Sequence, residues 1–232
     1  METGKATAAL VIPALNEEAV IGQTLARIPA GLFALVIVAD NGSTDRTSEV
    51  ARKAGALVVR TEERGYGAAC LLAMAAIPDD IEAVVFMQAD GSEDPAEAVH
   101  LLSPVYDGRA DLVLGSRVTG IVENGALLPH QRCGNWLATK LIWWIYGFRY
   151  TDLGPFRAIR WTALRRMGMR DRNYGWTVEM QVRAVQQGLR VMEVPVSYAV
   201  RRAGENKVSG NLKASILAGV KILWLVGRLA KG

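Results

Sequence analysis

Residues 8–17 read Ala-Ala-Leu-Val-Ile-Pro-Ala-Leu-Asn-Glu, an apolar run that passes directly into polar residues. Positions 8–13 have the length and the unbroken hydrophobicity of a strand buried on both faces, as the strands of parallel sheets are. The runs Ala-Leu-Val-Ile-Val-Ala at 34–39 and Ala-Val-Val-Phe-Met at 83–87 repeat the pattern. Strands of this kind predict a largely parallel sheet.

Helical segments are expected between these strands. Ser43, Thr44 and Asp45 can cap a helix N-terminus, and Gly55 is typical of a helix C-terminus. The alternation predicts an α/β fold with a doubly wound, mostly parallel sheet flanked by helices. The expected helices are 17–28, 43–55, 67–77 and one that opens at Asp94-Pro95, and further strands are expected at 56–60 and 111–115.

The second half of the chain is organised differently, but no stretch in it has the composition of a linker. We therefore expect a single domain over residues 1–232, closed by a C-terminal amphipathic helix at about 211–230. The segments expected before it are helices at 132–146 and 176–187 and strands at 156–160 and 191–198.

The composition is that of a globular protein, with 50% apolar and 22% charged residues. Cys70 and Cys133 are far apart and lack metal-ligand spacing, which favours a reducing compartment. No run of about 18 uncharged apolar residues occurs, so no transmembrane helix is predicted. The polar start and the short apolar run 10–13 do not fit a signal peptide, so a cytoplasmic protein is expected.

The charge distribution points to an anionic partner. The net charge is +4, and basic residues cluster between Arg157 and Arg202. No recognised nucleic-acid-binding motif occurs, so nucleic acid is not the expected partner. A phosphorylated substrate or an anionic membrane fits the basic cluster better.

Polar residues follow four of the predicted strands. In open parallel sheets, ligands bind outside the carboxyl ends of the strands. Each polar turn alone could be an ordinary turn or helix cap, but four of them at one edge predict a binding crevice. They are 13–17, 40–43, 88–90 and 115–117.

Several other kinds of site are excluded by the sequence. Residues 65–70 begin like a dinucleotide-binding fingerprint, but the final glycine is missing and the segment does not follow the first strand. No G-x-x-x-x-G-K phosphate loop and no G-x-S-x-G nucleophile motif occurs. His100 and His130 have no metal-ligand spacing.

Taken together, these motifs resemble family-2 glycosyltransferases of the GT-A fold, and among them the dolichol- or polyprenyl-phosphate mannosyl- and glucosyltransferases. The resemblance runs in family order from about residue 10 to residue 210, and its strength lies in the set of motifs together. The matching segments are 12–17, 40–47, 64–69, 88–91, 115–117, 152–157, 193–195 and 202–207.

The resemblance implies a role for particular residues. A nucleotide pocket for a UDP- or GDP-sugar is implied at Pro13, Leu15, Asn16, Glu17, Asp40, Gly42, Gly65, Gln88, Ala89 and Asp90. Acceptor contacts are implied at Arg117, Arg132, Arg157, Glu179, Arg202 and Lys207. Asp90, Arg117 and Arg202 are the expected catalytic residues.

The resemblance also implies a divalent metal, Mg²⁺ or Mn²⁺, held by Asp90 with the help of Gln88. Breaking a glycosyl–phosphate bond builds charge on the departing diphosphate, which a hard divalent ion and fixed cations stabilise. Gln88 departs from the family pattern, because the D-x-D motif carries an acid at that position. Ser92 also stands where the family often has Gln, and Gly154-Pro155 replaces a more usual Ser-Gly.

Three functions are consistent with these residues. The leading interpretation is inverting transfer of a sugar to a lipid phosphate, which needs no general base because the acceptor already carries charge. A second is transfer to a soluble or hydroxyl-bearing acceptor, with Glu179 as the base; the alternative role for Glu179 is a buried pair with an arginine such as Arg157. A third is binding of a nucleotide sugar without turnover, since Gln88 weakens the metal motif.

Two segments predict association with a membrane surface at its cytoplasmic, inner face. In a C-terminal helix, Lys213, Lys221, Arg228 and Lys231 fall on one side, opposite an apolar surface that includes Trp224. Residues 136–148 contain three tryptophans and a lysine, a composition found at membrane interfaces. The alternative for both segments is packing against the domain.

Overall fold

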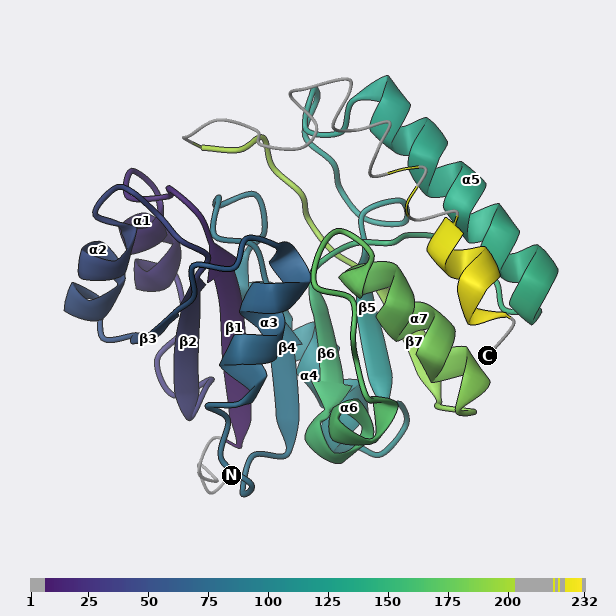
Figure 1. The fold of residues 1–232 in the computed structure, drawn as a ribbon, viewed down its shortest axis with the longest axis horizontal. Coiled ribbons are helices and arrows are strands. Elements are labelled where there is room, and N and C mark those ends of the chain that lie inside the picture. The colour runs from purple at the N-terminus through teal and green to yellow at the C-terminus, as the bar shows by residue number, and fades with distance from the viewer. Residues whose placement is uncertain (1–6, 203–218, 220, 222–223, 231–232) are drawn as a thin grey trace.

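The computed structural model describes residues 7–202, 219, 221 and 224–230. Seven strands of this part form one sheet in the order β3-β2-β1-β4-β6-β5-β7 (Figure 1). The strands β1 to β4 are mutually parallel, as are β5 and β7, whereas β6 is antiparallel to both of its neighbours. Their bounds are β1 (Ala8–Ala14), β2 (Leu35–Asp40), β3 (Leu57–Arg60), β4 (Ala83–Phe86), β5 (Leu112–Ser116), β6 (Arg157–Arg160) and β7 (Val191–Pro195).

Helices cover both faces of the sheet, which confirms the predicted α/β, doubly wound, mostly parallel architecture (Figure 1). The helices that pack on one face are α1 (Ile21–Ala26), α2 (Thr47–Lys53) and α4 (Ala98–Tyr106), which follows the short 3₁₀ turn η1 (Pro95–Glu97). The helices that pack on the other face are α3 (Tyr66–Met74), α5 (Pro129–Tyr146), α6 (Trp161–Met167) and α7 (Trp176–Gln186).

The two helical layers explain why the strand sequences are apolar at every position. Successive residues of a strand point to opposite faces. In β1, Leu10 and Ile12 face the core beneath α1 and α4, and Ala9 and Val11 face the core beneath α3 and α7. All four are fully buried, so no polar alternation marks the strand.

Most differences from the sequence prediction lie at element ends and in the second half. Helix α1 begins at Ile21, four residues later than expected, because the preceding residues form the turn at the end of β1. Helix α6 was not predicted. It starts immediately after β6, so no turn residues separate the strand from the helix. Residues 196–198 were expected to extend β7, but the strand ends at Pro195.

The described part of the C-terminal segment packs on the domain. Leu225 and Val226 are buried, and Tyr146 donates a hydrogen bond of 2.5 Å to the Val226 carbonyl. Lys221 lies 3.0 Å from Asp171, so it pairs with the protein, contrary to its expected place on a lipid-facing side. Lys213 and Lys231 lie outside the described residues. Of the helices that the structure describes, none has the length and hydrophobicity needed to cross a membrane.

Candidate active site

A cavity of about 530 Å³ opens at the carboxyl ends of β1 and β4, and we call it the strand-end cavity. This is the edge at which the polar turns were expected to meet. Of the ten positions expected to bind nucleotide, all but Asp40 and Gly42 line this cavity. Those that do are Pro13, Leu15, Asn16, Glu17, Gly65, Gln88, Ala89 and Asp90.

The turns after β1 and β2 are fastened to each other by side-chain hydrogen bonds. The amide N–H of Asn16 donates to Ser43 Oγ over 2.9 Å, and Asn16 Oδ1 accepts from the Thr44 N–H over 2.8 Å. The Glu17 N–H donates to Thr47 Oγ1 over 2.8 Å. Ser43 was expected to cap α2, but its hydroxyl holds the β1 turn. These bonds fix one wall of the cavity.

Asp40 supports this wall from beneath and does not line the cavity. Its carboxylate is fully buried and accepts bonds from the Ser43 N–H, the Ser48 hydroxyl and Arg60. Burial acts to raise the pKa of Asp40, but these bonds and the Arg60 charge outweigh it and hold the pKa below its ordinary value. The nucleotide contact expected at Asp40 stays a prediction, since in this arrangement its oxygens are used to shape the turn.

The glycines of the 64–69 motif are needed for a close backbone approach. A Cβ on Gly65 would lie 2.0 Å from the Arg172 carbonyl oxygen, and one on Gly67 would lie 1.9 Å from that of Asp171. The Ala68 N–H donates to the Arg172 carbonyl over 2.9 Å. This contact brings the loop that carries Asn173 and Tyr174 to the cavity, where both side chains line it. No sequence pattern had indicated a role for that loop.

Asp90 lies on the turn that follows β4 and is 6% exposed. Its Oδ1 accepts from the Ser92 N–H at 3.1 Å and from the Ser92 hydroxyl at 2.6 Å. The Ser92 hydroxyl also lies 3.3 Å from Gln88 Oε1, so Ser92 ties the two expected metal ligands together. Both present oxygen atoms at the cavity, which are the ligands that Mg²⁺ and Mn²⁺ prefer.

One basic side chain, that of Arg201, pairs with the two acids of the strand-end cavity, Glu17 and Asp90. Arg201 lies 3.3 Å from Asp90 Oδ2 and 2.9 Å from Glu17 Oε1, and it also lines the cavity. A cation therefore fits at Asp90. No group of three or more His, Cys, Asp or Glu side chains suited to a metal occurs among the described residues. Arg201 was not predicted as a site residue.

Glu93 is a buried acid directly behind the same turn. Its Oε2 accepts a 2.7 Å hydrogen bond from the Gln88 N–H, while Oε1 is buried without a hydrogen-bond partner among the described residues. Burial, assisted by the Asp90 charge, raises the pKa of Glu93 to about 8 despite the bond from Gln88. Burial thus favours the protonated, uncharged form of Glu93 beneath Gln88.

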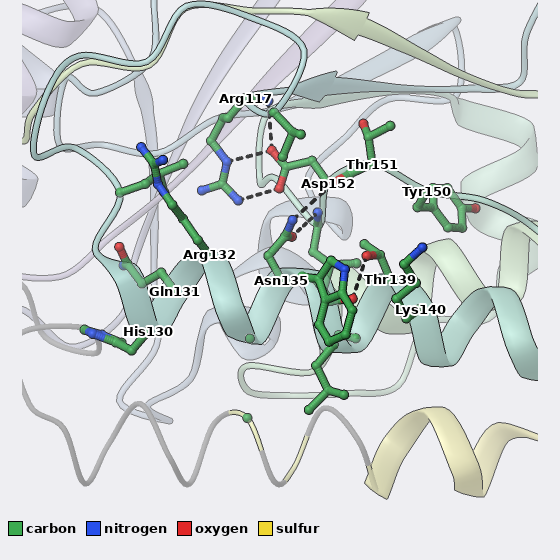
Figure 2. A pocket seen from close by; sticks show the side chains of 18 of the residues that line it. Arg117, His130, Gln131, Arg132, Asn135, Thr139, Lys140, Tyr150, Thr151 and Asp152 are labelled. Carbon is green, nitrogen blue, oxygen red and sulfur yellow. Dashed lines mark hydrogen bonds and ion pairs between the residues drawn. The ribbon is translucent and has the colours of Figure 1, made fainter.

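A second cavity, of about 830 Å³, lies along α5, and we call it the α5 cavity. Arg117 lines it from the end of β5, and Asn135 and Arg132 line it from the helix (Figure 2). Asn135 fixes the helix to the loop that precedes β6. Its side chain accepts a hydrogen bond from the Leu153 N–H and donates one to the Thr151 carbonyl. Apolar side chains complete the lining, among them Val118, Val122, Leu127, Trp136 and Leu137.

Arg117 is held in the α5 cavity by a two-bonded pair with Asp152. Its Nε and Nη2 donate to the two carboxylate oxygens over 2.8 and 2.7 Å (Figure 2). Burial acts to raise the pKa of Asp152, but the bonds and charge of Arg117 lower it below its ordinary value. Arg132 extends from α5 on the same side of the helix as Arg117 (Figure 2).

Tyr198 lies between the two cavities. The Arg117 guanidinium lies over the Tyr198 ring, at 5.1 Å from the ring centroid, and the Tyr198 hydroxyl lies 3.4 Å from Gln88 Oε1. Gln88 lines the strand-end cavity and Arg117 lines the α5 cavity. Tyr198 therefore joins a residue that lines one cavity to a residue that lines the other.

The other residues expected to contact the acceptor lie in different environments. Arg202 is exposed beside the Asp90 turn, where its N–H donates to the Asp90 carbonyl over 3.2 Å. Lys207 lies outside the described residues. Arg157 is fully buried and donates to the carbonyls of Thr177 and Gly154, so this structure lends no support to the expected contact with an acceptor.

Glu179 is also a structural residue. It is 2% exposed and accepts from the N–H groups of Arg170 and Asp171 and from Arg183 Nε. Its oxygens are therefore occupied, which argues against a role as general base. The expected buried ion pair exists, but its partner is Arg183, one helical turn away, and not Arg157.

Comparison with known proteins places these features in a family. The family model described as "Glycosyl transferase family 2" matches residues 9–171. An uncharacterized glycosyltransferase of Mycobacterium tuberculosis is 40% identical over 215 residues, which cover 90% of this chain and 93% of that protein. A dolichyl-phosphate hexose transferase of Haloferax volcanii is 34% identical over 204 residues, covering 86% of each chain.

Among solved structures, the fold is similar to that of glucosyl-3-phosphoglycerate synthase from M. tuberculosis in complex with Mn²⁺, UDP-glucose and phosphoglyceric acid. The TM-score is 0.78 at 24% sequence identity, and the match covers 99% of this chain and 81% of that one. At this level of identity, the likeness concerns the fold.

Proposed function

This chain belongs to glycosyl transferase family 2 and is a glycosyltransferase with the GT-A fold, and on that premise we propose that it transfers a sugar from a UDP- or GDP-sugar to a lipid phosphate. The proposal treats residues 1–232 as one catalytic domain. It assigns the donor to the strand-end cavity and the acceptor to the α5 cavity.

The contacts of Tyr198 with Gln88, which lines the strand-end cavity, and with Arg117, which lines the α5 cavity, carry this proposal. Transfer requires the anomeric carbon of the donor and the acceptor oxygen to lie about 3–3.5 Å apart. A donor whose diphosphate lies at Asp90 can direct its sugar past Gln88 toward Tyr198 and Arg117. An acceptor phosphate held by Arg117 and Arg132 then faces that sugar from the other side.

The donor end fits a divalent metal. We assign Asp90 as the charged ligand of Mg²⁺ or Mn²⁺ and the Gln88 carbonyl oxygen as a neutral one, with the donor's phosphates supplying further ligands. When bound, the metal stabilises the negative charge of the diphosphate. The structurally similar glucosyl-3-phosphoglycerate synthase was crystallised with Mn²⁺ and UDP-glucose, which supports the assignment. Arg202, beside the Asp90 turn, adds a second positive charge near the diphosphate.

The acceptor end fits a group with an anionic head and an apolar body. Arg117 and Arg132 supply cations, and Trp136, Leu137 and Val118 supply apolar surface in the same cavity. A phosphate oxygen of the acceptor attacks the anomeric carbon as the bond to the diphosphate breaks, and the electron pair leaves with the diphosphate. Because the phosphate is already ionised, no base is required, which agrees with the occupied oxygens of Glu179.

The outer side of α5 supports docking at the cytoplasmic face of a membrane. Trp144 is 84% exposed and Trp136 58% exposed. Lys140 and Arg149 each lie over the Trp143 ring, at 5.1 and 4.2 Å from its centroid. Exposed aromatic residues among basic ones suit the interface of an anionic bilayer, and here they border the cavity that receives the acceptor.

A soluble phosphorylated acceptor is the second candidate. The similar structure from M. tuberculosis binds phosphoglyceric acid, which shares the anionic group but lacks an apolar body. The cations of the α5 cavity suit either acceptor. The apolar lining of the cavity and the exposed tryptophans beside it favour the lipid.

A product assay decides between these acceptors. The purified protein is incubated with Mn²⁺ and a panel of UDP- and GDP-hexoses, and each of three acceptors is offered: polyprenyl phosphate, polyprenol and 3-phosphoglycerate. We expect mass spectrometry to detect one added hexose on polyprenyl phosphate alone. Product on 3-phosphoglycerate or polyprenol alone would contradict the lipid-phosphate proposal. Stabilisation by nucleotide sugar without any product would instead indicate a binding protein.

A further inference from the structure

Arg201 joins two carboxylates that lie far from it in the sequence. Its Nη1 lies 2.9 and 3.1 Å from the two oxygens of Glu17, and its Nη2 lies 3.3 Å from Asp90 Oδ2. The carboxylate side chains are 6% and 8% exposed, while that of Arg201 is 23% exposed. The guanidinium therefore reaches the floor of the strand-end cavity and remains accessible from it.

The two oxygens of Asp90 have different partners. Oδ1 accepts two bonds from Ser92, which belongs to the same turn and stays with it. Oδ2 is held by Arg201. A cation that binds Asp90 from the cavity therefore competes with Arg201 for Oδ2, because two positive groups cannot share one carboxylate oxygen without strong repulsion.

The backbone on both sides of Arg201 is hydrogen-bonded to the Asp90 turn. The Ala199 N–H donates to the Ser92 carbonyl over 2.8 Å, and the Arg202 N–H donates to the Asp90 carbonyl over 3.2 Å. These bonds fasten the segment on both sides of Arg201 to the Asp90 turn. A rotation of the long side chain is then enough to carry the guanidinium from Asp90 to a neighbouring anion within the cavity.

We propose that Arg201 is an exchangeable counter-ion of Asp90, which holds Oδ2 until a divalent cation binds there and then moves to the diphosphate of the donor. This inference rests on the proposed function, since it takes the metal and the nucleotide sugar from it. If Arg201 exchanges in this way, binding of the metal and binding of the nucleotide are thermodynamically coupled. The metal must displace Arg201, and the nucleotide provides the displaced guanidinium with a new anionic partner.

Arg201→Gln should therefore change the two affinities in opposite directions. Without nucleotide, Mn²⁺ no longer competes with a guanidinium, so its affinity should rise about tenfold, the effect expected for one charge-assisted contact. With saturating Mn²⁺, UDP loses a cationic partner, so its affinity should fall about tenfold. A purely structural role for Arg201 would weaken both.

The experiment titrates free Mn²⁺ by electron paramagnetic resonance and UDP by calorimetry. Arg27→Gln is the matched control, because it removes another Arg–Asp pair, with Asp94 at 3.3 Å, that lies outside the cavity lining. We expect the control to equal the wild type. Thermal unfolding verifies that each variant is folded, and Arg201→Lys provides a second variant that keeps the charge and should retain weak nucleotide-free Mn²⁺ binding.

The outcomes separate this inference from the proposed function. The exchange is supported if Arg201→Gln, but not Arg27→Gln, raises the nucleotide-free affinity for Mn²⁺ and lowers the affinity for UDP. If the wild type binds Mn²⁺ in the presence of UDP, but the nucleotide-free affinity of Arg201→Gln is unchanged or lower, the exchange is wrong and the metal assignment stands. If the wild type does not bind Mn²⁺ even with UDP, both the exchange and the metal assignment are overturned.

Discussion

The strand-end cavity and the α5 cavity are built in different ways. Residues around the first are fixed by hydrogen bonds between turns of neighbouring strands, such as those from Asn16 to Ser43 and Thr44. The second depends on one helix and on Asn135, which ties that helix to the loop before β6. The turns at the sheet edge thus build the donor site, whereas the acceptor site is shared between α5 and the segments that follow β5 and precede β6.

The cavities also differ in charge. Two acids, Glu17 and Asp90, line the strand-end cavity and share one cationic partner, Arg201. In the α5 cavity the only acid lining it is Asp152, among the described residues, and this acid is already paired with Arg117. The first cavity therefore suits a metal–diphosphate complex, and the second suits an anion with an apolar body.

The largest effect is expected at the floor of the strand-end cavity. Asp90→Ala removes the only charged ligand that we assign to the metal, so transfer should fall by about a hundredfold or more. Steady-state turnover with saturating Mn²⁺ is the measurement. Asp94→Ala is the control, because this acid lies in the same loop but is 39% exposed and caps η1. Wild-type turnover in Asp90→Ala would refute the metal assignment.

The next effect concerns the buried pair of the α5 cavity. Asp152→Asn leaves Arg117 without its counter-charge and should lower the free energy of unfolding by about 3 kcal/mol at pH 7. Arg117 holds the pKa of Asp152 below its ordinary value, so the pair stabilises the fold above the pKa of the unfolded state, about 3.9. That contribution is lost as the pH falls through the folded pKa.

Urea unfolding of both proteins at pH 7 and at pH 3 measures this dependence. The difference between wild type and Asp152→Asn should be large at pH 7 and smaller at pH 3. Glu49→Gln removes an exposed pair with Lys53 and should have no measurable effect at either pH. An equal loss at both values for Asp152→Asn would show that packing, and not the ion pair, accounts for it.

A smaller effect is expected on the outer side of α5. Replacing Trp144 by Ala removes its most exposed tryptophan, so binding to anionic vesicles should weaken several-fold at low salt. Sedimentation with vesicles measures it, and high salt should weaken binding of the wild type as well. Leu57→Ala on β3, at the opposite edge of the sheet, should bind like the wild type (Figure 1). Equal binding by both variants would exclude α5 from the membrane contact.

The smallest effect is expected at Gln88. Gln88→Asp restores the acid of the family's D-x-D motif and should preserve or modestly raise Mn²⁺ affinity in the presence of UDP. The gain is limited because the new acid adds a second negative charge close to Asp90, to which Ser92 already links the side chain at position 88. Calorimetric titration of Mn²⁺ tests this, and a marked loss of affinity would show that Gln88 does not face the metal.

The sheet and much of the strand-end cavity could be predicted because both follow from short sequence patterns. Apolar runs locate β1 and β4, and the residues just after them, including Asn16 and Asp90, must lie at the carboxyl edge. Asp40 follows the same rule, yet its side chain turns inward to Ser43, Ser48 and Arg60. Sequence position fixes where such a residue lies, but not the direction of its side chain.

Other parts of the site depend on contacts between distant segments. Arg201 pairs with Glu17 across 184 positions, and Asn173 reaches the cavity only because Gly65 and Gly67 admit the loop before α7. No local pattern marks either contact. The burial of Arg157 was also not predictable, because an arginine in a basic cluster gives no sign that it will be fully enclosed in the fold.

The division of the two cavities between donor and acceptor is the central claim, and one pair of variants tests it directly. Arg64 is an exposed arginine that lines the strand-end cavity, and Arg132 is an exposed arginine that lines the α5 cavity. Steady-state kinetics are measured for Arg64→Gln and Arg132→Gln with the nucleotide sugar and the polyprenyl phosphate varied in turn. We predict that Arg132→Gln raises KM for the lipid phosphate about tenfold and leaves KM for the donor unchanged, while Arg64→Gln does the reverse. A rise in the same KM in both variants, or an exchange of the two effects, would contradict the account.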